Sequence, residues 1–106
     1  MIIKVYYVGR RYRTKAFGEY DTDTGHITVL KGSVISESIT QFSGTKKVIK
    51  LRNQFTNEEG VLLRDMTFKS PTTAAKFVSG GSVNGLIAWH DGNKKTLKAI
   101  LQEREK

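Results

Sequence analysis

The sequence contains no cysteine, one proline and one tryptophan among its 106 residues. The lack of cysteine excludes disulfide bonds, cysteine-ligated zinc and thiol chemistry, and it is compatible with a reducing compartment. No apolar run reaches the length that crosses a bilayer, and Lys4 interrupts the apolar N-terminus where a signal peptide needs a continuous core. We therefore expect a cytoplasmic protein that makes no membrane contact.

Known catalytic and metal-binding patterns are also lacking. His26 and His90 stand alone, without a second ligand at helical spacing. The segment DTDTGH begins like a calcium loop, but His26 and Gly32 occupy the positions where such a loop needs Gly and Glu. No pair of carboxylates is spaced for acid-base catalysis. We expect no enzyme activity, no metal and no cofactor.

The residue pattern predicts one α+β domain over residues 1–106, a small antiparallel sheet of about four to five strands with about three helices packed on it. Three stretches before the first expected helix are rich in β-branched and aromatic residues, and Asp23-Thr24-Gly25 marks a hairpin turn between the second and the third. The expected strands are 2–8, 15–21, 26–35, about 65–69 and a short buried one within 86–92.

Helical spacing begins at Thr45 and is expected to continue to a stop at Gly60. A second helix begins at Pro71, with Ser70 as its N-cap, and ends at Gly80. The third follows Leu97 and ends in the frayed residues 102–106. In the first helix, one expected face is apolar (Val48, Leu51 and Phe55) and the opposite face is polar (Lys46, Lys50, Asn53 and Asn57).

The stretch GGSVNG, residues 80–85, has two competing interpretations: a loop that holds a ligand or a turn that locks the fold. It matches neither the Walker loop, nor the dinucleotide fingerprint, nor the nucleophile elbow. Gly80 suits a left-handed helix end, and Asn84-Gly85 is a common turn pair, so the turn is favoured. The alternative stays open that Asn84 and nearby backbone N–H groups contact a phosphate or a base edge.

Charge is the strongest compositional signal. Eighteen Lys and Arg residues against ten Asp and Glu give a net charge of +8, with +6 in residues 1–53 and +2 in residues 54–106. Such a field favours polyanions through phosphate contacts that release counterions, although a charge of about 2 to 8 also serves solubility in small domains.

Cations and aromatic rings alternate in the segment VYYVGRRYRTKAF, residues 5–17, which supplies charges for phosphates and rings for stacking. An exposed hairpin whose tyrosines pack on the core is the plainer alternative. Lysines at the start of the first helix oppose its dipole, so helix stability does not account for them, and two explanations stay open: a polyanion partner, or neutral drift on a solvated face. The candidate nucleic-acid-binding residues are Arg10, Arg11, Arg13, Lys46, Lys47, Lys50 and Asn84.

Three specific pieces occur in this order along the sequence: Lys31-Gly32-Ser33, Ser70-Pro71 with Ala74-Ala75, and Ser82-Val83-Asn84-Gly85 followed by Trp89. Through these pieces, residues 15–101 resemble an uncharacterised domain family that is often appended to GIY-YIG endonucleases and to restriction-modification subunits. The C-terminal part is also similar to the restriction-enzyme and adenine-methylase-associated domain. This sequence has Leu86 where family members usually carry a tryptophan after the Asn-Gly pair.

The resemblance implies a DNA-linked role. Together with the charge pattern, it leads us to expect a noncatalytic nucleic-acid-binding or targeting module, with DNA as the partner. A nuclease or methyltransferase subunit is a second expected partner. The alternative is a protein-interaction module that docks such an enzyme and does not touch DNA.

Overall fold

The computed structural model describes residues 1–9, 14–36, 39–42 and 44–104. Its strands form one antiparallel sheet in the order β1-β2-β3-β4, which confirms the expected α+β class, and the described residues contain four helices. In chain order the elements are β1 (Ile2–Val8), β2 (Lys15–Asp21), β3 (Ile27–Val29), α1 (Thr45–Phe55), β4 (Met66–Phe68), α2 (Pro71–Ser79), α3 (Gly85–Ala88) and α4 (Leu97–Arg104).

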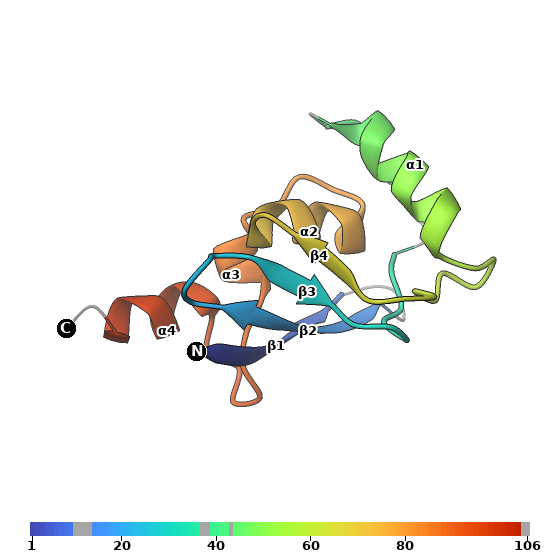
Figure 1. Ribbon diagram of the computed structural model, residues 1–106. Helices are drawn as coiled ribbons and strands as arrows, with labels where there is room; N and C mark the ends of the chain where they lie inside the picture. Colours follow the sequence, from blue (N-terminus) through green and yellow to red (C-terminus); the bar gives the residue numbers. More distant parts are fainter. Residues whose placement is uncertain (10–13, 37–38, 43, 105–106) are drawn as a thin grey trace.

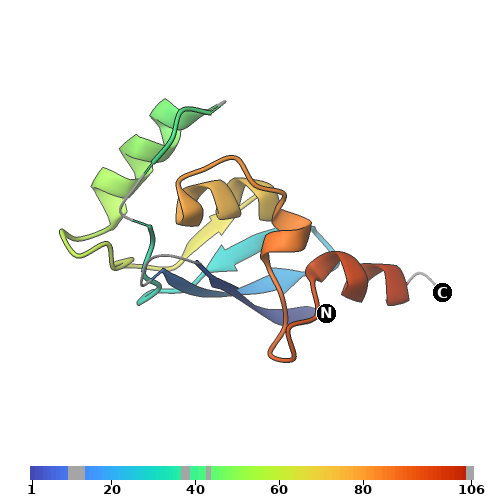
Figure 2. The same ribbon diagram turned by 180° about the vertical axis from the view of Figure 1, so that it is seen from behind.

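The helices α2 and α3 lie on one face of the sheet (Figures 1 and 2). The alternation of the strands explains which face they cover, because Val5 of β1 is buried while its neighbours Lys4 and Tyr6 are exposed. The core between the layers contains Trp89 and Phe77, both without exposed surface, and the Phe68 and Phe77 rings lie with their centroids 5.3 Å apart.

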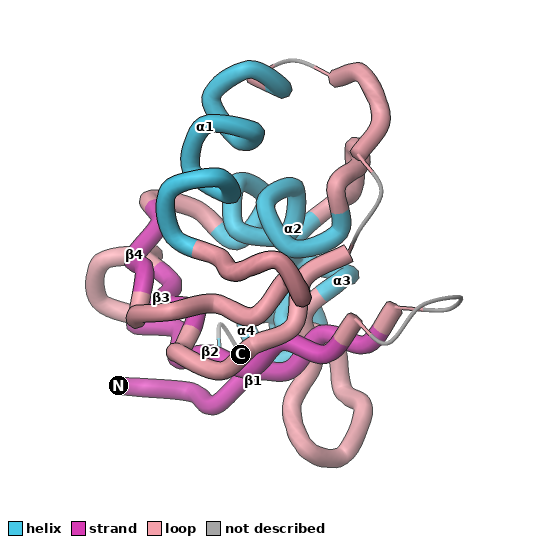
Figure 3. The backbone as a smooth tube through the Cα atoms, turned by 90° about the vertical axis from the view of Figure 1, so that its right-hand side faces the viewer, coloured by secondary structure: helices cyan, strands magenta, loops and turns pink. Residues whose placement is uncertain are grey.

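The helix α1 lies at the outer side of the molecule, beyond α2 (Figures 1 and 3), and α4 lies at the opposite end in Figures 1 and 2. In α1, Thr45, Val48 and Arg52 are buried, and Leu51 and Phe55 are partly buried against the core, so one side of this helix attaches it to the rest of the domain. The other side of α1, which includes Lys46, Lys50 and Asn53, is exposed.

The third expected strand, 26–35, is shorter than the sequence predicted and ends at Val29. Gly32 has a φ of 94°, and the backbone N–H of Ser33 donates to the carbonyl oxygen of Leu30. Its left-handed conformation, which only glycine adopts without a steric penalty, turns the chain out of the sheet. The hairpin before it is confirmed, with Tyr20 paired to Ile27.

The first helix also ends earlier than expected, at Phe55 instead of Gly60. The Thr56 hydroxyl donates to the carbonyl oxygen of Arg52, and the Asn57 side chain accepts N–H groups from Glu59 and Val61. These short-range hydrogen bonds compete with the backbone bonds that would continue the helix. Thr and Asn side chains commonly form such bonds at helix ends.

The expected strand within 86–92 is wrong, because residues 85–88 form α3. The Asn84 side-chain oxygen accepts from the Leu86 N–H, which caps this short helix and explains why the apolar run does not extend. Beyond it, His90 pairs with Tyr6 of β1 only as an isolated bridge.

The turn interpretation of GGSVNG is confirmed. Gly80 is the left-handed C-cap of α2, with a φ of 74°. A Cβ on Gly85 would lie 2.2 Å from the carbonyl carbon of Pro71, so only glycine fits where α3 crosses the start of α2. Trp89 Nε1 donates to the Pro71 carbonyl oxygen at 3.0 Å and stabilises the same contact between α3 and the start of α2. The stretch holds two helices together.

Candidate nucleic-acid interface

Three of the predicted binding residues lie together on α1. Lys46, Lys47 and Lys50 are all exposed on this helix. Arg10, Arg11 and Arg13 lie outside the described residues, between β1 and β2 in the sequence. α1 is therefore the element on which the described part of the chain brings the predicted cations together.

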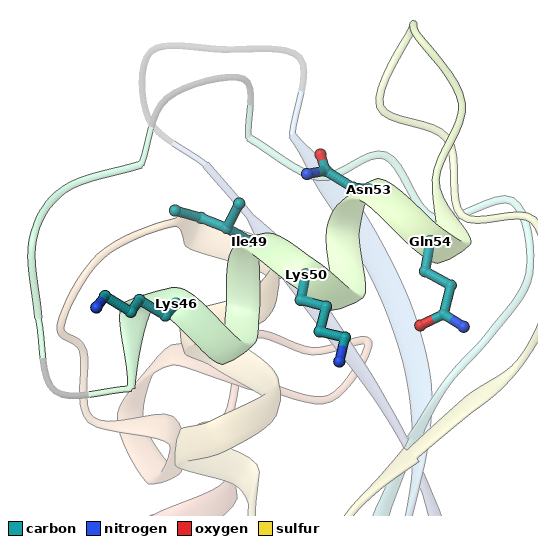
Figure 4. Close-up of a pocket in the computed structure, with 5 residues that line it drawn as sticks. All are labelled: Lys46, Ile49, Lys50, Asn53 and Gln54. Carbon is teal, nitrogen blue, oxygen red and sulfur yellow. The ribbon is translucent and has the colours of Figure 1, made fainter.

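A stripe of side chains with helical spacing covers the outward face of α1. Residues 46, 49, 50, 53 and 54 follow the i, i+3, i+4, i+7, i+8 pattern of a single helix face. They line a shallow, open surface depression of about 510 Å³. In Figure 4, Ile49 and Asn53 lie on one flank of the helix, and Lys50 and Gln54 lie on the other. Lys46 lies at the N-terminal end. We call these five residues the α1 stripe.

Arg52 holds α1 so that the stripe faces outward. Its side chain is 8% exposed and donates from Nε to the Phe77 oxygen at 2.9 Å and from Nη2 to the Val78 oxygen at 3.3 Å. Nη1 donates to the Ser36 oxygen at 2.9 Å. A cation at the C-terminal carbonyl groups of α2 is favoured by the dipole of that helix. Burial lowers the pKa of Arg52, which nevertheless stays protonated.

The start of α1 is fixed by its neighbours in sequence. Gly44 precedes the helix with a φ of 88°, and the Thr45 hydroxyl bonds to the backbone of Phe42, accepting its N–H at 2.6 Å. Lys76 of α2 lies over the Phe42 ring at 5.8 Å from the centroid. These contacts tie the segment before α1 to α2, so both ends of the helix are positioned by the domain.

The electrostatics of α1 suit an anionic partner. Its sequence, TKKVIKLRNQF, contains four basic residues and no acidic one. Since Arg52 is buried in contacts with carbonyl groups, three exposed lysines determine the charge that a ligand meets. Lysine ammonium groups and side-chain amides bind phosphates and base edges, whereas they lack the paired acid and base that hydrolytic chemistry needs.

Asn84 is exposed but has a structural task. Its oxygen caps α3 by accepting from the Leu86 N–H at 3.0 Å. It does not line the depression on α1. A contact of Asn84 with nucleic acid stays a prediction, and the cap already accounts for an Asn at this position.

The α1 stripe contains three residues that the sequence did not single out as candidates: Ile49, Asn53 and Gln54. Their spacing from Lys46 and Lys50 was the available signal, because residues three and four apart share a helix face. Ile49 is 39% exposed, so its apolar side chain is available to a partner beside the lysines.

The uncovered sheet face carries a second set of exposed apolar residues. Phe17 and Tyr6 are paired across β2 and β1, and Val8 is 58% exposed. A smaller open hollow of about 210 Å³ lies on the sheet and includes an acidic residue. Its lining residues are Lys4, Tyr6, Phe17, Gly18, Glu19 and Leu30.

Within the described ranges, no three His, Asp or Glu side chains gather in a way that could hold a metal ion. None of the helices in the same part of the chain has the length and apolar character needed to cross a membrane. The His90 ring nitrogen Nδ1 lies 2.8 Å from the Asp91 carbonyl oxygen, a local contact.

The fold and the surface define a small α+β domain with one outward helix that is basic and rich in amides. The chain belongs to the family described as domain of unknown function (DUF4357), which matches residues 6–101. This match confirms the resemblance to an uncharacterised domain family. Neither the comparison with curated proteins nor that with solved structures gave a significant match.

Proposed function

We propose that this protein is a noncatalytic DNA-binding or DNA-targeting module, and that α1 makes its main contact with the nucleic acid. The observation that supports this proposal is the outward face of α1, where Lys46, Lys47 and Lys50 stand without an acidic residue on the same helix. The phosphate backbone supplies most of the affinity of such contacts.

The positions of these lysines are explained better by binding to an anion than by the stability of the helix. Lys46 and Lys47 lie in the first turn of α1, where positive charge costs about 0.3 to 1 kcal/mol per residue through the helix dipole. An anionic partner compensates this cost in the complex. The proposed link to a restriction-modification or nuclease system rests on the resemblance alone, and a subunit of such a system is a proposed partner.

Fluorescence anisotropy with labelled duplex and single-stranded DNA tests the proposal. We expect saturable binding at about 50 mM salt that weakens steeply by about 200 mM. Replacement of Lys46, Lys47 and Lys50 by Glu is expected to abolish binding while the thermal unfolding transition stays cooperative. Unchanged affinity in this folded variant, or no binding by the natural protein at low salt, would contradict a DNA-binding role.

The uncovered sheet face favours a second candidate, a module that docks a nuclease or methyltransferase subunit without touching DNA. Exposed Val8 and Phe17 provide apolar area that a protein partner would bury. The test is co-purification with a co-expressed subunit of either enzyme class. A Val8→Glu/Phe17→Ser variant should lose the complex, whereas absence of any complex with the natural protein rejects this candidate.

A further inference from the structure

We infer that α1 enters the major groove of duplex DNA and that Asn53 and Gln54 read base edges there, with adenine as the preferred base. This inference rests on the proposed function and deepens it, since phosphate contacts alone would bind any sequence. It concerns residues of the α1 stripe that carry no charge.

The shape of the site fits the groove. The major groove is about 12 Å wide and admits an α-helix, provided that a broad arc of the helix surface is free. At 100° per residue the α1 stripe spans an arc of about 140°, and the buried residues Val48 and Arg52 lie on the opposite side. α1 also lies on the outside of the molecule, beyond α2 (Figures 1 and 3), so its outward face points away from the domain.

The spacing of the α1 stripe fits the base-pair repeat. The rise from Lys46 to Gln54 is about 12 Å, which corresponds to three or four base pairs at about 3.4 Å each. Asn53 projects within about 20° of Lys46 in helical projection, near the middle of the stripe. The middle of a helix in the groove faces the bases, which places Asn53 to read them, while Gln54 lies at one edge of the stripe, next to Lys50 in projection. The long lysine side chains extend from the same face to the phosphates that border the groove.

The chemistry of the α1 stripe predicts which base is read. Asn and Gln amides each donate and accept, so they form paired hydrogen bonds with the N6 and N7 atoms of adenine in the major groove. Ile49 lies on the same flank as Asn53 in Figure 4 and supplies the apolar contact that recognises the thymine methyl group. An amide and an exposed Ile side by side therefore favour A·T pairs.

Selection of bound sequences from a pool of duplexes with a randomised centre tests the inference. The natural protein is expected to enrich a short motif of about three to four positions that contains A·T pairs. An Asn53→Ala/Gln54→Ala variant should keep its salt-dependent affinity for the unselected pool and lose the enrichment. Gln102→Ala, an exposed amide removed from α4, is the matched control and should enrich the same motif. Alanine favours helix, so the variant is expected to fold.

A second measurement locates the contact in the major groove. Replacing adenine by 7-deazaadenine in the selected motif removes the N7 acceptor and preserves base pairing. We expect affinity to fall at least about fivefold for the natural protein and to stay constant for Asn53→Ala/Gln54→Ala. An equal loss in both proteins would overturn the inference.

The outcomes separate this inference from the proposed function. If the natural protein binds the pool with steep salt dependence but enriches no motif, the base-reading role of α1 is wrong and DNA binding stands. If the Asn53→Ala/Gln54→Ala variant enriches the same motif, the base-reading role is equally wrong. If the natural protein does not bind the pool at about 50 mM salt, both fail.

Discussion

The Arg52 side chain donates from Nε to the backbone oxygen of Phe77 at 2.9 Å, across the contact between α1 and α2. Phe77 is without exposed surface, so the link joins the outward helix to the hydrophobic core. A guanidinium group presents several donors in one plane and can satisfy carbonyl groups from two segments at once. The orientation of α1, and with it the proposed DNA contact, depends on this side chain.

Replacement of Arg52 by Ala is expected to lower the free energy of unfolding by about 2 to 4 kcal/mol, because the buried carbonyl groups of Phe77 and Val78 lose a charged donor. Urea denaturation measures the change. Arg64, an exposed arginine over the Phe55 ring at 5.5 Å, is the control, and Arg64→Ala should cost about 1 kcal/mol or less. Equal effects of both substitutions would contradict a structural role for Arg52.

Gly85→Ala should destabilise the fold severely, by about 3 kcal/mol or more, because its Cβ would lie 2.2 Å from the Pro71 carbonyl carbon. At Gly92 a Cβ would meet nothing within 4 Å, so Gly92→Ala should be neutral or stabilise by up to about 1 kcal/mol. Thermal and urea unfolding of the two variants test the close packing of α3 on α2. A Gly85→Ala protein as stable as Gly92→Ala would refute it.

Much of the fold is readable because its signals are local. The Ser70 cap, Pro71 and the left-handed Gly80 define α2, and the Asp23-Thr24-Gly25 turn sets the β2–β3 hairpin. The errors in the predicted helices and strands arise where side-chain hydrogen bonds compete with the regular backbone pattern. The Thr56 hydroxyl donates to the Arg52 carbonyl oxygen, and α1 ends there earlier than predicted. The Asn84 side chain accepts the Leu86 N–H, and the apolar run that follows forms a short helix instead of a strand.

The candidate site was predicted in part. Helical spacing correctly placed Lys46, Lys50 and Asn53 on the outward face of α1, whereas Asn57, expected on the same face, lies beyond the end of the helix. What the pattern could not supply is why that helix stands outside the core, which depends on Arg52 reaching carbonyl groups 25 and 26 residues further along the chain. Such long-range contacts have no signature in the local sequence.

Lys46→Glu is expected to stabilise the fold and to weaken DNA binding. The substitution replaces a cation by an anion in the first turn of α1, which favours the folded state by about 0.3 to 1 kcal/mol per charge at low salt. Lys98 occupies the first turn of α4 and is also exposed, so Lys98→Glu should give a similar gain in stability. Only the α1 variant should lose DNA affinity, and a parallel loss in both would show that net charge alone governs binding.

Asp91 is expected to contribute stability that disappears in acid. The backbone N–H of Lys95 donates to its carboxylate at 2.9 Å, and this bond, with a second from Asn93, holds the pKa of Asp91 below its ordinary value of 3.8. Because the folded pKa lies below the unfolded one, the contribution is complete above the ordinary pKa and is lost as pH falls through the folded pKa. The melting temperatures of the natural protein and of Asp91→Ala should therefore differ at pH 7 and converge as the pH falls below the folded pKa. A constant difference would exclude this role.

We propose that α1 binds the phosphate backbone, and the salt dependence of duplex binding measures this contact. Each lysine that contacts a phosphate adds about 0.9 to the slope of log affinity against log salt. For Lys46→Ala/Lys50→Ala we predict a slope reduced by about two, and for the exposed pair Lys69→Ala/Lys98→Ala an unchanged slope. Equal slopes for the natural protein and the α1 variant, or equal reductions in both variants, would contradict the assignment of α1 as the DNA-binding element.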